Sequence, residues 1–463
     1  MHNLLVQDGE AYELPQIRKK IPGKIVYSED AVNTYIWQDT AEQNEYFGFV
    51  SLIQKTELHS TWYTESFSTR SNDLVHISSW GSFIDKSDYV GRMNGIWILL
   101  KGIPTIKIWQ FPATYGELRQ VLKSQNVDFF NILSCLDSIR DGRTHFVLLG
   151  FPIPRYFNRE IEEFTWIAFQ LPVLARQNVK IPGFRQNAQG LPLIADRRNV
   201  LNDKESIWWI NTENWNQNTI SSRGRLHMPL CRSRILVIGA GCIGASIAEL
   251  LVRGGVDTLG IIDEDTLETG NLSRHTLLID DLSDSKAIRL AKRLNGASPN
   301  VKITAYNYML DEDNIRDILV HYNVIIDCTG ENDVLQDLST LQSDKDKLII
   351  SISISYAAKH LFVAIVNGKK FQFDSFLDII REFLEPQEET GVQENEVMKN
   401  EAIGCWHPLF PARCDEVWLA AATAIQAVNR YFESKSTSSL VLVYKQLTDG
   451  FEIGYALEKQ HVL

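Results

Sequence analysis

The sequence has few cysteines and no arrangement of them that forms a familiar site. The six cysteines of the 463-residue chain lie at positions 135, 231, 242, 328, 405 and 414, and no two of them make a CxxC pair. Neither a disulfide framework nor a four-thiolate zinc site of the usual spacing is therefore expected. Scattered free cysteines fit a reducing compartment, so the predicted location is cytoplasmic.

Targeting signals, long apolar runs and an excess of basic residues are also absent. The N-terminus, MHNLLVQDGEAYELPQIRKK, lacks the basic, apolar and small-residue order of a signal peptide. No apolar run approaches the roughly 20 residues that span a bilayer, so no membrane partner is expected. The formal net charge of −12 argues against a dedicated nucleic-acid binder. With 44% hydrophobic and 22% charged residues, the composition is that of a globular protein.

The chain changes character near residue 230, which predicts two domains, 1–225 and 226–463. The first part has short β-like runs such as GIWILL and no glycine-rich phosphate loop. It also holds nine of the eleven tryptophans, at positions 37, 62, 80, 97, 109, 166, 208, 209 and 215. We expect an α+β domain here, whose tryptophans serve either partner recognition or a β-rich core.

From residue 234 onward, strand-like and helix-like segments alternate. Strands are expected at 234–239, 258–263, 301–306, 322–328 and 347–353, and helices at 242–253, 283–294, 311–319 and 331–342. This alternation predicts an α/β fold with a largely parallel, doubly wound sheet. The segment LFVAIVNGKKFQF predicts a hairpin with its turn at Asn367-Gly368. Residues 385–403 are polar and acidic, which predicts a mobile loop that forms part of a cysteine-containing segment, 385–414.

A glycine-rich turn follows the first of these strands. Gly239, Gly241 and Gly244 form GxGxxG in RILVIGAGCIGA. Such a turn lets the backbone approach a phosphate and places the amides of the helix N-terminus towards the anion. Asp263 ends the second strand, nineteen residues after Gly244. An acid at this position binds ribose hydroxyls, which by itself would favour NAD.

The residues after Asp263 favour ATP instead. Asn271 and Arg274 follow closely in DEDTLETGNLSRH, and Lys286 comes twelve residues after Arg274. An NAD enzyme has no evident need for these cations, whereas the β- and γ-phosphates of a nucleoside triphosphate must be neutralised. Attack on the α-phosphate with loss of pyrophosphate requires the same cations, usually with Mg²⁺.

Residues 225–353 resemble the ThiF/MoeB/HesA family, the adenylating domain of ubiquitin-activating enzymes. The motifs that carry the resemblance are GAGCIGASIAELLVRGGV, IIDEDTLETGNLSRH, the lysine of SDSKA, SPNVKITAYN and IIDCTGEN. The NLSRH form, with His275 where many members have glutamine, looks closest to a bacterial branch of ubiquitin-like conjugation found in antiviral defence.

The resemblance implies an enzyme that uses ATP to adenylate the C-terminal carboxylate of a ubiquitin-like protein. It assigns Asp263 and Asp265 to the nucleotide, and Asn271, Arg274 and Lys286 to the triphosphate, with Arg274 and Lys286 catalytic. Where the family has an aspartate for Mg²⁺ in a DCTDN-like stretch, this chain has DCTGEN. Asp327 is then the candidate metal ligand, with Glu331 as the other substitute.

A catalytic cysteine is expected, because ubiquitin-activating enzymes pass the adenylated carboxylate to a thiolate. Cys405 follows the predicted mobile loop, lies two residues before His407, and is the preferred candidate, with Cys414 in reserve. A nearby imidazolium or helix N-terminus would lower the pKa of such a thiol. Cys242 and Cys328 lie within the nucleotide fold and read as packing residues, and Cys135 and Cys231 lack a motif.

The resemblance also bears on the N-terminal domain and on partners. The corresponding region of relatives is either an inactive adenylation-like half or a conjugating-enzyme-like module. The expected partners are a ubiquitin-like protein, a ubiquitin-conjugating-like enzyme and a second copy of the chain as a homodimer. Two alternatives remain open at this point: an NAD-dependent oxidoreductase that uses the same glycine turn, and a nucleotide-binding scaffold without catalysis.

Overall fold

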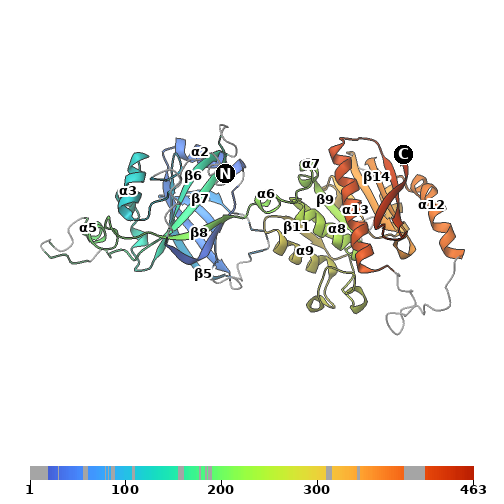
Figure 1. Ribbon diagram of the computed structural model, residues 1–463, viewed down its shortest axis with the longest axis horizontal. Helices are drawn as coiled ribbons and strands as arrows, with labels where there is room; N and C mark the ends of the chain where they lie inside the picture. Colours follow the sequence, from blue (N-terminus) through green and yellow to red (C-terminus); the bar gives the residue numbers. More distant parts are fainter. Residues whose placement is uncertain are drawn as a thin grey trace. The chain divides into compact units, whose positions relative to one another are not determined.

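The computed structural model describes the chain from residue 19 onward, except for residues 30, 56–60, 79, 82, 85–88, 107–109, 155–160, 177–178, 183–184, 186–189, 309–314, 341–344 and 390–411. The described residues form two compact units (Figure 1). Unit 1 comprises those within 1–79 and 84–219, and unit 2 comprises those within 80–83 and 220–463. Within the described parts of the chain, no helix has the length and apolar character needed to cross a membrane.

Unit 1 is built on a sheet of eight strands. The strands are β1 (Lys20–Tyr27), β2 (Phe47–Lys55), β3 (Thr61–Thr69), β4 (Leu74–Ile77), β5 (Tyr89–Leu99), β6 (His145–Pro154), β7 (Ile161–Leu171) and β8 (Trp208–Asn214). The helices are α2 (Ala31–Glu42), α3 (Tyr115–Ser124), α4 (Phe129–Cys135), η2 (Asp137–Ile139) and α5 (Leu191–Arg198), with α6 (Gln217–Ile220) at the junction with unit 2.

The sheet of unit 1 closes on itself. Its order is β1-β8-β7-β6-β5-β2-β3-β4, and β1 pairs with β3 as well as with β8. The strands β1, β8, β7, β6, β5, β2 and β3 therefore form a closed barrel, and β4 pairs with β3. Most neighbours are antiparallel, and closure removes free strand edges. This is not the open, doubly wound sheet that an inactive adenylation-like half would require.

Both faces of the barrel wall are buried. Along β5, Trp97 and Leu99 join a cluster to which β1, β2, β3, β6, β7 and β8 also contribute, so this cluster fills the barrel interior. Ile96 and Ile98 alternate with them and pack outside against α3 and α4. The alternation follows the two-residue period of a strand.

Tryptophans form much of the interior of unit 1. Trp37, Trp97, Trp166 and Trp209 are among the largest fully buried side chains of the chain. The rings of Trp37 on α2 and Trp166 on β7 lie 5.0 Å apart, and both indole Nε1–H groups donate to the buried carboxylate of Glu29 at 3.0 Å. The β-rich core therefore accounts for a large part of the tryptophan enrichment, and a partner-binding role for unit 1 stays a prediction.

Unit 2 contains the second eight-stranded sheet. The strands are β9 (Arg234–Ile238), β10 (Thr258–Ile262), β11 (Lys302–Tyr306), β12 (Val324–Asp327), β13 (Lys347–Ile354), β14 (His360–Gly368), β15 (Leu440–Leu447) and β16 (Gly454–Val462). The helices are α7 (Met228–Cys231), α8 (Cys242–Arg253), α9 (Lys286–Ala297), α10 (Ile315–Leu319), α11 (Asn332–Thr340), α12 (Phe373–Glu389) and α13 (Cys414–Glu433). Three short 3₁₀ turns are η3 (Thr269–Asn271), η4 (Ile279–Asp281) and η5 (Tyr356–Ala358).

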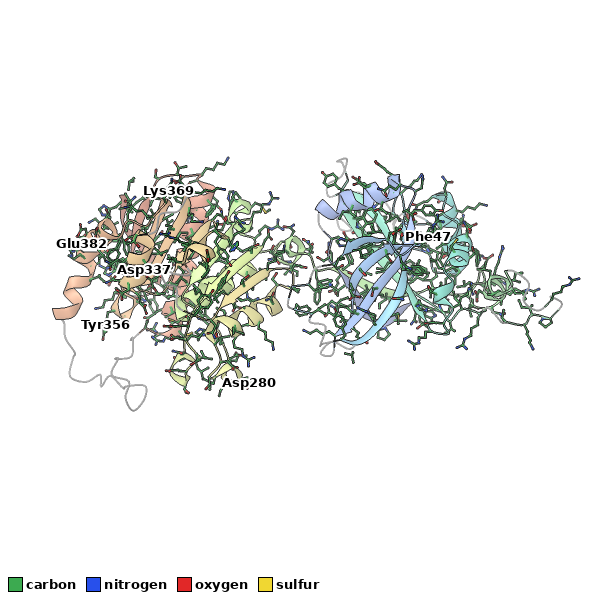
Figure 2. The ribbon with its side chains drawn as sticks, turned by 180° about the vertical axis from the view of Figure 1, so that it is seen from behind. Phe47, Asp280, Asp337, Tyr356, Lys369 and Glu382 are labelled. Atoms are coloured by element: carbon green, nitrogen blue, oxygen red, sulfur yellow. The ribbon has the colours of Figure 1, made fainter. Side chains whose placement is uncertain are left out.

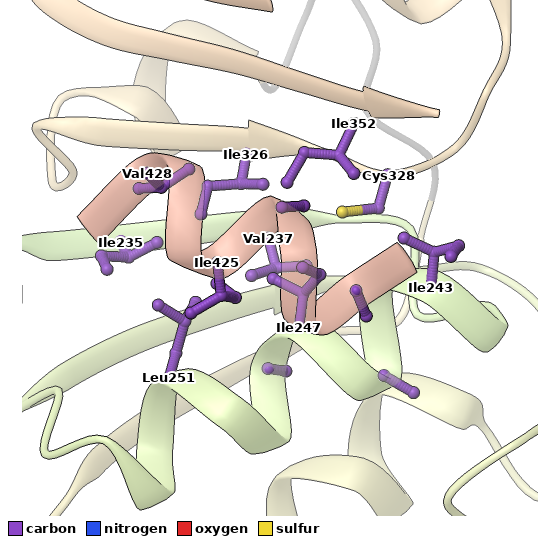
Figure 3. Packing of buried hydrophobic residues seen from close by; sticks show 14 of the residues in the cluster. Ile235, Val237, Ile243, Ile247, Leu251, Ile326, Cys328, Ile352, Ile425 and Val428 are labelled. Carbon is purple, nitrogen blue, oxygen red and sulfur yellow. The ribbon is translucent and has the colours of Figure 1, made fainter. Parts of the chain in front are cut away.

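The sheet of unit 2 is parallel from β11 to β13 and antiparallel beyond. Its order is β11-β10-β9-β12-β13-β14-β15-β16. Ile235 and Val237 of β9 face α8, α9 and α13 (Figure 3), whereas Leu236 and Ile238 face α10, α11 and α12. Helices thus cover both faces, and the predicted α/β class with a doubly wound sheet is confirmed. The strand order reverses between β9 and β12, the place where ligands bind in such folds.

Two local predictions in unit 2 were wrong. The hairpin expected at Asn367-Gly368 does not form, because β14 runs to Gly368 between β13 and β15, and the chain then enters α12. The loop expected from residue 385 begins later, because α12 continues to Glu389. The rest of that segment, 390–411, lies outside the described residues.

Candidate active site

The glycine turn joins the carboxyl end of β9 to α8. Gly239 has φ of +84°, a conformation that side chains disfavour. A Cβ at Gly244 would lie 1.9 Å from the carbonyl oxygen of Gly239, so the first turn of α8 can pack on the loop only without a side chain. Gly241 is the N-cap of α8, and a Cβ there would meet no heavy atom within 4 Å. The first and third glycines therefore shape the turn, and the second faces open space.

Two side chains hold the peptide of Ala240 within this turn. Asp263 accepts a hydrogen bond from the Ala240 N–H at 2.6 Å and one from the Asp265 N–H at 2.8 Å. His275 contacts the carbonyl oxygen of Ala240 through Nε2 at 2.6 Å, while its Nδ1 accepts the Leu277 N–H at 3.0 Å. Because Nδ1 accepts, Nε2 carries the proton and donates. The segments that contain Asp263 and His275 therefore meet the glycine turn at the Ala240 peptide.

Burial shifts both of these titratable groups towards their neutral forms. Burial raises the pKa of Asp263, although its two backbone hydrogen bonds and Lys286 oppose the shift. Burial lowers the pKa of His275, which keeps the imidazole neutral and able to accept from Leu277. The sequence offered no signal for this role of His275, because the contact with Ala240 spans 35 residues and exists only after folding.

A small cavity of about 210 Å³ lies in front of the turn. Its lining consists of Gly241, Cys242, Asn271, Arg274, His275 and Lys286. Lys286 is the first residue of α9, is 8% exposed, and donates from Nζ to Asp265 Oδ2 at 2.8 Å. Asn271 Oδ1 accepts the Glu268 N–H at 3.0 Å, which orders the η3 turn before Arg274. Two cations and a helix N-terminus therefore face one space, an arrangement suited to a polyphosphate.

The predicted site residues divide into two groups. Gly241, Asn271, Arg274 and Lys286 line the cavity. Gly239, Gly244, Asp263 and Asp265 lie behind it, where they shape the turn or hold Lys286. The residues chosen from the sequence are thus brought together, but several act through backbone contacts rather than at the cavity wall.

A second cavity of about 540 Å³ adjoins the first and shares Gly241, Cys242 and Arg274 with it. It lies over the carboxyl ends of β12 and β13, where Thr329, Ser351 and Ser353 line it. On its far side it is lined by the apolar side chains of Phe376, Leu377, Ile380 and Leu384 of α12. This wall was not predicted from the sequence, because the predicted hairpin ended at Phe373 and no element was assigned to residues 374–384.

Asp327, the candidate metal ligand, is fully buried. Its Oδ1 accepts hydrogen bonds from the hydroxyl and the N–H of Thr329 at 2.7 and 3.1 Å, and its Oδ2 accepts from Ser351 Oγ at 3.1 Å. Burial raises the pKa of Asp327 to about 6, against the effect of these hydrogen bonds. Gly330 of the DCTGEN stretch has φ of +72°. Among the described residues, no group of three or more His, Cys, Asp or Glu side chains lies close enough together to hold a metal ion.

The cysteines of unit 2 differ in their surroundings. Cys405 and His407 lie outside the described residues. Cys414 is partly exposed and is the first residue of α13. Burial raises the pKa of Cys242, Cys328 and Cys231, so these thiols are protonated packing residues.

The two halves of the chain match two family models. Residues 3–215 match the Cap2 central linker domain, and residues 219–413 match the ThiF family. An ATP-dependent ubiquitin transferase-like protein Cap2 from Enterobacter hormaechei subsp. hoffmannii is 30% identical over 454 residues, which cover 96% of this chain and 73% of that protein.

More distant similarities cover half of the chain or less. A sulfur carrier protein adenylyltransferase from Thermus thermophilus is 27% identical over 183 residues, 39% of this chain and 57% of that protein. A solved structure of E. coli MccB with ATP aligns with 50% of this chain and 64% of its own, at 12% identity and a TM-score of 0.37. The names of the sequence relatives agree with the expected class, an ATP-dependent adenylyltransferase.

Proposed function

Because the chain belongs to the Cap2 family of ThiF-domain proteins, we propose that it uses ATP to adenylate the C-terminal carboxylate of a ubiquitin-like protein and passes the product to a cysteine as a thioester. The family expected from the sequence motifs is confirmed. The ubiquitin-like substrate and the thioester are the parts of the proposal that go beyond the names of the relatives.

One observation carries the proposal: Arg274, Lys286 and the amide end of α8 face a single cavity in front of the glycine turn. In adenylation, a carboxylate oxygen forms a bond to the α-phosphorus, and the bond from that phosphorus to the pyrophosphate oxygen breaks. Negative charge then grows on the departing pyrophosphate. Preorganised cations at that point stabilise the transition state more than the ground state. Asp265 keeps Lys286 in place for this work at 2.8 Å.

Asp263 is suited to the nucleoside end of ATP. Both of its oxygens already accept one backbone N–H each, and a carboxylate oxygen can accept a second hydrogen bond. A ribose hydroxyl that donates to Asp263 would therefore join the nucleotide to the same group that fixes the glycine turn. This role supports ATP over a ligand that contacts only the phosphate loop.

The second step needs a thiolate. The sulfur of Cys405 would attack the acyl carbon of the mixed anhydride, and AMP would leave with the electrons of the broken acyl–oxygen bond. Cys414 is the reserve nucleophile. A Cys405→Ala variant is expected to keep carrier-dependent pyrophosphate exchange and lose the reducible carrier adduct on a non-reducing gel. An adduct that survives in Cys405→Ala and disappears in Cys414→Ala would assign the nucleophile to Cys414.

Exchange of labelled pyrophosphate into ATP, with a candidate ubiquitin-like protein added, tests the first step. We expect exchange that depends on the carrier. An oxidoreductase would instead bind NAD tightly and not ATP in titration calorimetry. A scaffold would bind ATP and exchange nothing with any carrier, an outcome that Gly330 in place of the family's acid makes worth testing.

The remaining partners belong to the same proposal. A homodimer and a ubiquitin-conjugating-like enzyme would complete a transfer pathway, and light scattering at working concentration tests the dimer. Mg²⁺ would enter with the triphosphate, since it is usually held by substrate phosphates and few carboxylates. The buried position of Asp327 fits poorly with direct binding to the metal. Pyrophosphate exchange assayed with and without Mg²⁺, in wild type and Asp327→Asn, distinguishes Mg²⁺ held by the substrate phosphates from Mg²⁺ bound by Asp327.

A further inference from the structure

The cavity beside the cationic site differs from it in chemistry. Of the described residues that line the larger cavity, Arg274 alone is charged, and Arg274 is at the end shared with the phosphate side. Ile352 of β13, Phe362 of β14 and the α12 side chains make the opposite end apolar. The volume of about 540 Å³ is within the range of pockets that hold small ligands or short chain segments.

The sheet order separates this cavity from the nucleoside position. Asp263 follows β10, on one side of β9, whereas Thr329 follows β12 and Ser351 lies within β13, on the other side. A nucleotide bound through Asp263 and the cations therefore occupies the β10 side of the glycine turn. The carboxylate whose oxygen attacks the α-phosphorus must then approach from the opposite side, over β12 and β13.

The helix α12 gives the larger cavity its selectivity. Phe376 and Ile380 are buried, Leu377 is half-buried and Leu384 is 37% exposed, so the apolar wall runs from the interior to the surface. Glu382 of the same helix, labelled in Figure 2, does not line the cavity; its side chain is 55% exposed and pairs with Lys459 of β16. The apolar wall is therefore a property of the cavity side and not of the whole helix.

We infer that this wall selects a carrier tail with an uncharged, apolar side chain close to its C-terminal carboxylate. The inference rests on the proposed adenylation. A leucine-sized side chain against Leu377 and Ile380 would bury apolar area, whereas a lysine or glutamate would be desolvated beside a wall that offers no opposite charge. The tail would run from Leu384 inward, with its carboxylate at the junction near Arg274.

Peptide binding tests this inference without requiring turnover. The probes are fluorescent peptides with free C-terminal carboxylates, built of alanine with one leucine, lysine or glutamate at the second, third or fourth residue from the end. Anisotropy is measured on the full chain with a non-hydrolysable ATP analogue present. We expect the leucine peptide to bind roughly tenfold more tightly than its charged counterparts at one or more positions, as occupation of an apolar pocket gives.

A variant of the wall provides the second arm. Leu377→Glu should remove the leucine preference and strengthen binding of the lysine peptide, while affinity for the ATP analogue stays unchanged. Ser375→Glu is the matched control, because it adds the same charge to an exposed position of α12 that does not line the cavity. The control should behave as wild type.

Three results would overturn the inference. The first is equal binding of leucine, lysine and glutamate peptides at every position, and the second is no binding of any peptide. The third is a loss of affinity for the ATP analogue in Leu377→Glu that is as large as the loss of affinity for the leucine peptide. That result would place the adenine in this cavity instead. If the leucine peptides bind with the expected preference but no pyrophosphate exchange follows, the proposed adenylation fails and the tail site remains.

Discussion

The two units bury polar groups in different ways. In unit 1 two sets of buried polar groups are paired with one another: Glu29 accepts from two indoles, and Arg140 donates to Asp196 Oδ2 at 2.7 Å with both side chains almost fully buried. In unit 2 the buried Lys286 and the partly exposed Arg274 line a cavity. The charged groups named in unit 1 are enclosed among protein groups, whereas those named in unit 2 border a cavity.

This difference follows from the sheets. The closed barrel of unit 1 is filled by packed apolar and aromatic side chains around Glu29, and its cavity of about 490 Å³ has Lys101 as the one charged residue among the described residues that line it. A parallel sheet with a reversal between β9 and β12 places the ends of β9, β10, β12 and β13 at one edge. The chemistry of the chain is concentrated there for that reason.

The largest expected effect is on the stability of unit 1. Asp196→Ala should lower the free energy of unfolding of unit 1 by about 3–5 kcal/mol, because it leaves the Arg140 guanidinium buried without its partner. Affinity of unit 2 for ATP should stay unchanged. Urea unfolding followed by tryptophan fluorescence, with ATP titration in parallel, measures both.

Glu213→Ala is the control for that variant. Its ion pair with Lys24 has side chains 44% and 35% exposed, and such pairs contribute about 0–1 kcal/mol. A loss of ATP binding in Asp196→Ala, at a temperature where the protein stays folded, would contradict the separation of roles between the units.

The second effect is on catalysis in unit 2. Lys286→Ala should lower carrier-dependent pyrophosphate exchange by about 10²–10³-fold, as removal of one preorganised group at a developing charge does. The melting temperature should hardly change. Arg289→Ala is the matched control, because Arg289 lies one turn on in α9 and pairs with Asp284 away from the cavity. Exchange at the wild-type rate in Lys286→Ala would make this lysine a structural partner of Asp265 only.

The sequence predicts more of unit 2 than of unit 1. In unit 2 the glycine turn, Asp263, Arg274 and Lys286 follow one another within about fifty residues, so local patterns and strand alternation indicated both fold and site. In unit 1 the barrel depends on pairing of β1 with β3 and with β8, nearly 190 residues away, which no local pattern reveals.

Particular errors have physical causes. The Asn-Gly pair at 367–368 has the composition of a hairpin turn, but Asn367 is paired with Leu348 of β13 and bonded to Ser439. The α12 residues Phe373, Phe376, Leu377 and Ile380 have the spacing of an amphipathic helix, so a signal was present there. The contact of His275 with the carbonyl of Ala240 had no such signal in the sequence, because a histidine in a loop gives no indication of the carbonyl that it will contact.

A third prediction separates two glycines of the same turn. Gly244→Ala should destabilise unit 2 by about 1–3 kcal/mol, because its Cβ would collide with the backbone oxygen of Gly239. Gly241→Ala should leave stability almost unchanged, since a Cβ there meets nothing, but should weaken ATP binding by occupying the cavity. Thermal unfolding and calorimetry decide; the same response in both variants would mean that the turn acts as one structural unit.

The smallest expected effect concerns His275, which joins the cation-bearing segment to the glycine turn. The glutamine side chain also offers N–H donors and an acceptor oxygen, so His275→Gln should keep pyrophosphate exchange within a few-fold of wild type. His275→Ala should lose more of the exchange activity, because the Ala240 carbonyl and the Leu277 N–H lose their contacts with the ring. Since burial lowers the pKa of His275 in the folded state, its contribution to stability is complete above the ordinary pKa of about 6.5 and is lost as the pH falls through the folded value.

Wild type should therefore lose stability on acidification below about pH 6.5 more steeply than His275→Gln, which has no group to protonate there. Unfolding curves between pH 7 and 5 measure the difference, and exchange assays over the same range show whether activity follows it. Parallel curves for the two proteins would show that the pKa of His275 is the same in the folded and unfolded states. A His275→Gln variant as inactive as His275→Ala would mean that the ring itself, and not its donor and acceptor pair, positions the turn.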